Sequence, residues 1–146
     1  MSSSIARRSL TTGLTLALSF GSHAHAEVVA IVSAKSAVHV LAKSELTDIF
    51  LGRKIRFPDG QQAVPLDQAV GSPSRDAFYT GVVGISAVQL KAHWSKIIFT
   101  GRGKPPRAVP NEIEVRRTVS SNLFAIGYID RTLVDDSVKI LRIQQQ

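Results

Sequence analysis

Residues 64–78, VPLDQAVGSPSRDAF, decide how the rest of the chain is interpreted. A short apolar run enters a turn, and a Gly-Ser-Pro-Ser-Arg sequence leads from that turn into a predicted helix. A helix N-terminus presents unpaired N–H groups and a partial positive charge. Glycine permits close approach of a ligand, and hydroxyl groups donate hydrogen bonds. The turn is therefore a candidate oxyanion site, formed by Gly71, Ser72, Ser74 and Arg75.

The same turn has a purely structural interpretation. Ser72 caps the helix, Pro73 occupies its first position, and Arg75 is exposed to solvent. Proline also removes one N–H donor from the candidate site. The residues alone favour this capping interpretation over the anion site.

Strands and capped helices alternate on either side of this turn. Strands are predicted over residues 27–32, 63–66, 124–129 and 138–143, the first of them buried on both faces. Helices are predicted to begin at four capping residues, Ser44, Ser72, Ser86 and Asn111. This alternation predicts an α/β fold with a mixed, mainly parallel sheet flanked by helices.

Finer features of these helices follow from residue spacing. Capping boxes are predicted for Ser86 with Gln89 and for Asn111 with Glu114. Apolar residues recur on one face of the first and third helices, where they indicate burial. They are Leu46, Ile49 and Phe50 in the first, and Ala87, Leu90, Trp94 and Ile97, continuing to Phe99, in the third. Residues 100–110, rich in Gly and Pro, predict a loop.

The N-terminal residues have the features of a secretory signal peptide. Arg7 and Arg8 precede an apolar run of about a dozen residues, and Ala24-His25-Ala26 is a small-x-small cleavage site. The run is short of the roughly 20 residues that span a bilayer, so cleavage is favoured over an uncleaved anchor. We expect a signal peptide over residues 1–26, a single domain over residues 27–146, and a periplasmic location. The arginine pair leaves general and twin-arginine export open.

Composition limits the possible functions. Without Arg7 and Arg8, 16 basic residues remain against 11 acidic ones, a net charge of +5 that suits an anionic ligand or simple solubility. The chain has no cysteine, which excludes thiol chemistry and disulfides. No apolar stretch after the signal approaches membrane-spanning length.

Other kinds of site find little support. His39 and His93 have no second ligand at metal-binding spacing, so neither a metal nor a cofactor is expected. Ser72 lacks the nucleophile elbow of a hydrolase, so an enzyme is not expected, although Ser, His and Asp are all present. The basic loop GRGKPPR, residues 101–107, lacks the spacing of a P-loop, and nucleic-acid binding would need interleaved aromatics and a larger basic face.

Three blocks of sequence carry a resemblance to a known family. They are LTDIFLGRKIRFPDG from residue 46, VPLDQAVGSPSRDAFYTGVVG from residue 64, and AIGYID from residue 125. In this order they resemble the second lobe of periplasmic phosphate-binding proteins of ABC transporters, most of all short single-lobe relatives. The resemblance covers nearly all of residues 27–143 and implies one lobe of the type II periplasmic-binding fold.

The resemblance also implies a function. The domain would bind phosphate or a similar oxyanion without catalysis, as the receptor of an ABC permease. The hydroxyls of Ser72 and Ser74 and the N–H groups of Ser74 and Arg75 would contact the anion. Gly71 would permit its approach, and Arg75 would add charge.

Two departures leave an alternative open. Where the larger proteins carry an arginine before the turn, this chain has Leu66-Asp67, and Asp67 is a carboxylate that would repel a phosphate dianion unless it accepts a proton-bearing oxygen. The first lobe, which forms the other half of the clamp, has no counterpart. The alternative is an interaction module that has kept the fold and lost the ligand, and that docks on a second lobe, another copy or a different partner protein.

Overall fold

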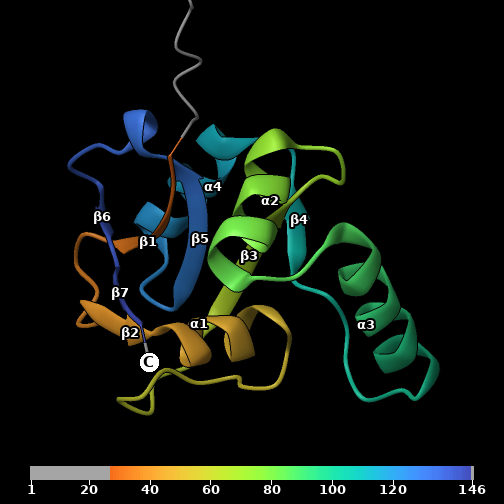
Figure 1. Ribbon diagram of the computed structural model, residues 1–146. Coiled ribbons are helices and arrows are strands. Elements are labelled where there is room, and N and C mark those ends of the chain that lie inside the picture. Colours follow the sequence, from red (N-terminus) through yellow and green to blue (C-terminus); the bar gives the residue numbers. More distant parts are fainter. Residues whose placement is uncertain (1–26, 146) are drawn as a thin grey trace, which may run out of the picture.

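A computed structural model describes residues 27–145 as two sheets with helices around them (Figure 1). The larger sheet has the strand order β4-β3-β5-β1-β6, and β2 pairs with β7 separately. The strands are β1 (Val28–Ser33), β2 (Val40–Ala42), β3 (Val64–Gln68), β4 (Arg107–Val109), β5 (Ala125–Asp130), β6 (Val138–Ile140) and β7 (Arg142–Gln144). The expected signal peptide lies outside the described residues.

The helices follow the predicted order. They are α1 (Lys43–Phe50), α2 (Pro73–Ala77), α3 (Ala87–Phe99) and α4 (Glu112–Ser121), with a short 3-10 turn η2 (Arg131–Leu133). Helix α2 continues directly into the π-helix η1 (Phe78–Val83), which ends at Gly84 with a positive φ of 83°. No helix within residues 27–145 is long and apolar enough to cross a membrane.

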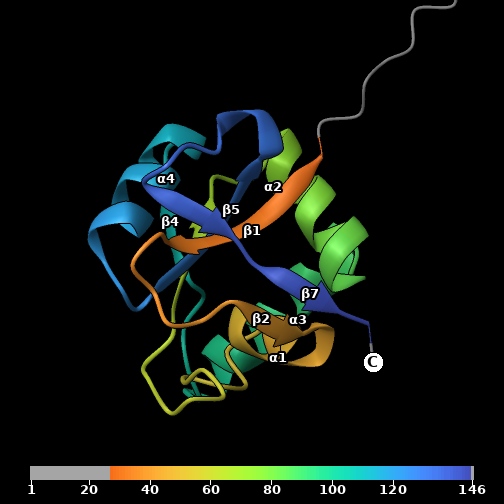
Figure 2. The same ribbon diagram turned by 90° about the vertical axis from the view of Figure 1, so that its left-hand side faces the viewer.

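The predicted fold class is confirmed. Strand β3 runs parallel to β4 and β5, β2 runs parallel to β7, and β1 is antiparallel to β5 and β6. Three of these five pairings are parallel, so the arrangement is mixed and mainly parallel. Helix α4 lies on one side of the main sheet, and α1 and the α2-η1 helix lie on the other (Figure 2).

The position of β1 between two cores explains why its sequence is apolar throughout. Ala30 and Val32 belong to the core on the α1 side, whereas Val29 and Ile31 belong to the core on the α4 side. Each of these side chains is at most 8% exposed. Both faces of the strand are therefore buried, as predicted.

Gly127 in β5 allows α4 to pack closely against the sheet. A Cβ at this position would lie 2.5 Å from Val115 Cγ1 and 3.3 Å from Val119 Cγ2. Both valines are fully buried. The glycine in AIGYI is thus a packing requirement of the helix above it, because no larger residue fits at this spacing.

One predicted helix start and one predicted capping box need correction. Helix α1 begins two residues earlier than expected and is capped by Ala42, whose N–H donates to the Glu45 carboxylate at 3.2 Å, so Ser44 is not its cap. Strand β2, which leads directly into α1, was not predicted. At α4, Asn111 accepts from the Glu114 N–H at 3.0 Å as expected, but the Glu114 carboxylate pairs with Arg117 instead of closing the box. The box at Ser86 and Gln89 is confirmed.

Two strands differ from the prediction. The end of the expected loop at residues 100–110 forms β4, which pairs in parallel with β3. The expected strand at residues 138–143 is divided into β6 and β7 at Leu141. The side chain of Leu141 is buried, and its N–H donates to the Ala30 carbonyl at 2.9 Å. These two contacts fix the point at which the chain passes from one sheet to the other. Strand partners far apart in the sequence fix both features, so local patterns do not reveal them.

The predicted apolar stripe of α3 is only partly correct. Leu90 and Trp94 are buried, but Ala87 is exposed and Phe99 is 92% exposed. Phe99 lies on the solvent side of the helix end, since it is five residues beyond Trp94 and the buried face follows steps of three and four. The expectation that Phe99 belongs to the core is therefore wrong.

Candidate functional site

The GSPSR turn (residues 71–75) connects β3 to α2. Ser72 is the N-cap of α2: its Oγ accepts from the Arg75 N–H at 3.4 Å and donates to Gln68 Oε1 at 2.7 Å. Pro73 is the first helical residue, and Gly71 has a φ of 90°, which favours glycine. The predicted cap and proline position are confirmed. The Ser72 hydroxyl has both a donor and an acceptor partner inside the protein.

Ser74 joins three elements. Its side chain is buried, and its Oγ donates to Glu112 Oε1 at 2.7 Å. The same carboxylate oxygen accepts from the Asp130 N–H, also at 2.7 Å. Ser74 therefore links the first turn of α2 to the start of α4 and the end of β5. The Glu112 carboxylate brings a negative charge to the hydroxyl that was expected to face an anion.

Asp67 is the centre of a buried polar network. Only 4% of the residue is exposed, and its carboxylate accepts from the Gln68 N–H at 2.8 Å and from the hydroxyls of Tyr79 (3.0 Å) and Tyr128. It also accepts from Arg75 Nε at 3.3 Å. A buried carboxylate needs such a set of donors, because burial without them is strongly unfavourable.

Arg75 is held by this network instead of projecting into solvent. Its side chain is 13% exposed and its guanidinium lies 5.1 Å from the centre of the Tyr79 ring. The capping interpretation placed Arg75 in solvent, and this is wrong. Its charge is balanced by Asp67, so the pair contributes little net positive charge to the turn.

The two tyrosines remain hydrogen-bond donors. Burial raises the pKa of Tyr79 and of Tyr128 far above the usual value, and the adjacent Asp67 charge and its hydrogen bonds raise both further. Both hydroxyls therefore stay protonated and donate to Asp67 wherever the domain is folded.

Sequence reasoning missed four members of this site: Gln68, Tyr79, Glu112 and Tyr128. Tyr79 and Tyr128 are the only tyrosines of the chain, and both occur in the blocks that carried the family resemblance. A buried Asp with two distant tyrosines gives no periodic signal. Glu112 is the first helical residue after the Asn111 cap, and an acidic residue there indicates only the start of a helix.

The remaining candidates stay apart from the turn. His93 is partly buried, with Nε2 at 2.8 Å from the Leu51 carbonyl, and exposed His39 lies beside Lys139. Within residues 27–145, no group of three His, Cys, Asp or Glu side chains is arranged to hold a metal ion. Ser72 bonds to Gln68 and to the Arg75 N–H, and neither partner is the histidine that a hydrolase requires.

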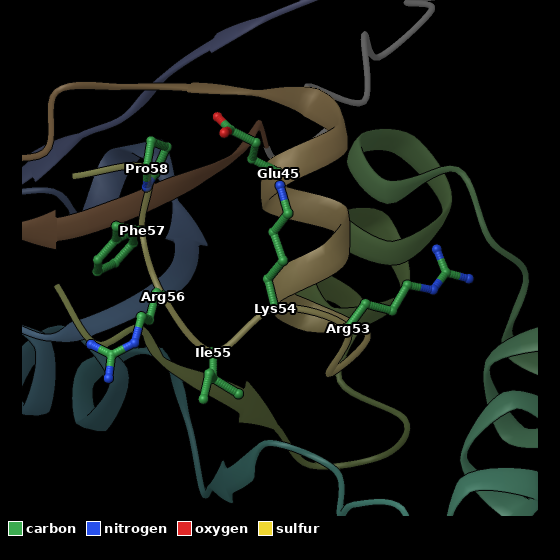
Figure 3. Close-up of a pocket in the computed structure, with 7 residues that line it drawn as sticks. All are labelled: Glu45, Arg53, Lys54, Ile55, Arg56, Phe57 and Pro58. Atoms are coloured by element: carbon green, nitrogen blue, oxygen red, sulfur yellow. The ribbon is translucent and has the colours of Figure 1, made fainter. Parts of the chain in front are cut away.

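A hollow of about 370 Å³ lies on another part of the surface, beside α1 (Figure 3). It is lined by Glu45, Arg53, Lys54, Ile55, Arg56, Phe57 and Pro58. Arg53 and Arg56 point away from each other, and Lys54 extends toward Glu45 (Figure 3). Because these cations do not converge, the hollow has no arrangement suited to a single anion.

Comparison with known proteins shows which class of fold this is. No family model and no curated protein matches the chain. Among solved structures, the domain has the fold of one lobe of phosphate-binding receptors of ABC transporters. The chain spans less than half the length of each of these structures.

Three such structures can be named. One, from Clostridium perfringens, is assigned as a phosphate ABC transporter substrate-binding protein and contains bound phosphate. It is 24% identical, with a TM-score of 0.63 over 80% of this chain and 44% of its own. An ABC-type phosphate transport receptor from Vibrio cholerae is 16% identical (TM-score 0.61, 80% and 45%). PstS from Borrelia burgdorferi is 13% identical (TM-score 0.60, 80% and 47%). The resemblance inferred from the sequence is thus confirmed for the fold.

Proposed function

We propose that this domain binds phosphate or a similar oxyanion, without catalysis, at the GSPSR turn. The observation that carries the proposal is the position of the turn. Strands β4, β3 and β5 are mutually parallel, and the turn follows the carboxyl end of β3. In open α/β sheets, ligands bind outside the carboxyl ends of the strands. The fold shared with a structure that contains bound phosphate supports the choice of ligand.

Binding would compete with contacts inside the protein. The Ser74 hydroxyl would leave Glu112, and Arg75 would be shared with Asp67. Each new hydrogen bond then contributes only about 0.5–1.5 kcal/mol against water. A few such bonds correspond to a dissociation constant of about 1 mM for the single lobe. Tighter binding would require a second surface that closes over the anion.

Removing both hydroxyls is expected to abolish phosphate binding. In wild-type protein, phosphate at about ten times its dissociation constant should stabilise the fold by about 1.4 kcal/mol relative to chloride at equal ionic strength. In Ser72→Ala/Ser74→Ala this stabilisation should disappear, because the donors are gone. Thermal unfolding with and without phosphate measures it.

Two further variants sharpen this experiment. Ser86→Ala removes the equivalent cap of α3 and should keep the full phosphate effect. Glu112→Gln should bind phosphate more tightly than wild type, because it removes a negative charge beside Ser74. An unchanged phosphate effect in the Ser72→Ala/Ser74→Ala protein would remove those residues from the site.

The setting of this function is also part of the proposal. Residues 1–26 are proposed to be a signal peptide, and the domain to act in the periplasm with an ABC permease, a second lobe or a second copy as partner. Support comes from the sequence of the first residues and from the transport role stated for the structural neighbours. Mass spectrometry of exported protein tests it, since the mature chain should begin at Glu27.

One observation favours a second candidate function, a protein-interaction module that binds no anion. The polar side chains of the turn already have partners: Ser72 bonds to Gln68, Ser74 to Glu112, and Arg75 to Asp67. The absence of any phosphate effect in both wild-type protein and Glu112→Gln would favour this candidate.

A further inference from the structure

Helix α3 exposes apolar residues on the face turned away from the core. Val88 is 79% exposed and Phe99 is 92% exposed, and together with Ala92 and Ser95 they follow steps of four, three and four along one line of the helix. Leu90 and Trp94 cover the opposite, buried face. Figure 1 shows α3 at the edge of the molecule. A large apolar side chain exposed at the end of a helix, as Phe99 is, suits a partner or an apolar medium.

The segment of chain that carries this line has only basic charges. Between Asp76 and Glu112 the chain has no acidic residue. It has five basic ones there, all exposed: Lys91, Lys96, Arg102, Lys104 and Arg107. None of the five takes part in a salt bridge within residues 27–145. The rest of residues 27–146 has 11 basic and 11 acidic residues, so the whole net charge of +5 belongs to this segment.

We propose that α3 and the loop after it dock on an anionic phospholipid bilayer. We call this surface the α3 face; its members are Val88, Lys91, Lys96, Ile98, Phe99, Arg102 and Lys104. On the helix, Lys91 and Lys96 lie on either side of the line from Val88 to Phe99, since successive residues turn by about 100°. Phe99 would enter the boundary between headgroups and acyl chains while the lysines contact lipid phosphates. The basic loop adds attraction to an anionic leaflet.

Charge and shape favour a bilayer over other occupants. A second copy would bring the same four cations of α3 and the loop to the contact, and like charges repel. Phe99 projects from a convex helix, so a protein partner would need a matching groove. A bilayer interface accepts a projecting aromatic side chain without shape complementarity. This inference is independent of the proposed phosphate site, which lies on a different element.

Vesicle co-sedimentation of the full chain tests the inference. We expect binding to vesicles of phosphatidylglycerol and phosphatidylcholine, weak binding to phosphatidylcholine alone, and release by high salt. Phe99→Ser should weaken binding about 10- to 100-fold. Lys91→Gln/Lys96→Gln should weaken it about 25-fold, at roughly fivefold per cation. Ile55→Ser, which removes a 70% exposed apolar side chain outside the α3 face, should bind like wild type.

Several results would overturn the inference. Equal binding of wild type and Phe99→Ser would mean that another segment, such as residues 1–26, contacts the lipid. No binding to anionic vesicles would overturn the inference. A dimer that dissociates in Phe99→Ser would assign the α3 face to a protein partner instead. Free phosphate should not displace the vesicles, and Ser72→Ala/Ser74→Ala should still bind them. Loss of phosphate binding in that variant together with retained vesicle binding separates the two proposals.

Discussion

Asp67→Ala is expected to destabilise the domain by about 3–5 kcal/mol, because it removes one partner of a buried ion pair. The change leaves the Arg75 guanidinium and the hydroxyls of Tyr79 and Tyr128 without their acceptor. Small domains are stable by only about 5–15 kcal/mol, so this is a large fraction of the total. Equilibrium unfolding in urea measures the difference.

Matched variants show whether the network causes this loss. Asp136→Ala removes an exposed carboxylate and should change stability by no more than about 0.5 kcal/mol. Asp67→Ala/Arg75→Ala should recover part of the loss, because the uncompensated charge is gone. If the single variant is too unstable to purify, Asp67→Asn keeps the shape and removes only the charge. Stability of Asp67→Ala within about 1 kcal/mol of wild type, near the ordinary effect of a point mutation, would contradict the account.

Alkaline pH is expected to unfold the domain through its two tyrosines. In the unfolded chain, a tyrosine ionises near its usual pKa of 10.0, whereas burial holds the pKa of Tyr79 and of Tyr128 far higher in the folded state. Above pH 10 the unfolded state therefore binds fewer protons than the folded state, and stability falls as pH rises. The loss is about 1.4 kcal/mol per pH unit for each tyrosine, and about 2.7 kcal/mol for both. Below pH 10 this contribution is fully present.

Ultraviolet absorbance of the phenolate reports this transition directly, because the chain has only these two tyrosines. The phenolate signal and the loss of circular dichroism should occur together, at a pH above that of free tyrosine. Tyr79→Phe should halve the absorbance change and reduce the slope of stability against pH. Ionisation of both tyrosines near pH 10 in protein that keeps its circular dichroism would show that they are not buried donors.

Local chemistry made much of the fold predictable. The strand at residues 27–32 is apolar because both of its faces are buried, and the caps at Ser72 and Ser86 act within a single turn of helix. Strand β4 has two exposed residues out of three and exists through its pairing with β3, so its sequence carries little strand signal. Phe99 was misplaced because it was counted with the apolar stripe, although it lies five residues beyond Trp94 and therefore on the other side of the helix.

The candidate site was less predictable than the fold. The sequence identified the residues of the turn, because glycine, serine and proline have local roles there. It could not show that Tyr128 reaches Asp67 across 61 positions, or that Ser74 reaches Glu112 across 38. These contacts depend on how β5 and α4 pack beside α2. They set the charge balance that governs whether an anion can bind.

Titration of isotope-labelled protein with phosphate tests whether the GSPSR turn binds an anion. The amide signals are followed by nuclear magnetic resonance at constant ionic strength, with chloride as the reference anion. We expect saturable shifts of the Ser74 and Arg75 amide signals, with a dissociation constant of about 1 mM. If those two signals do not move at phosphate concentrations about ten times higher, the GSPSR turn is a helix cap and not an anion site.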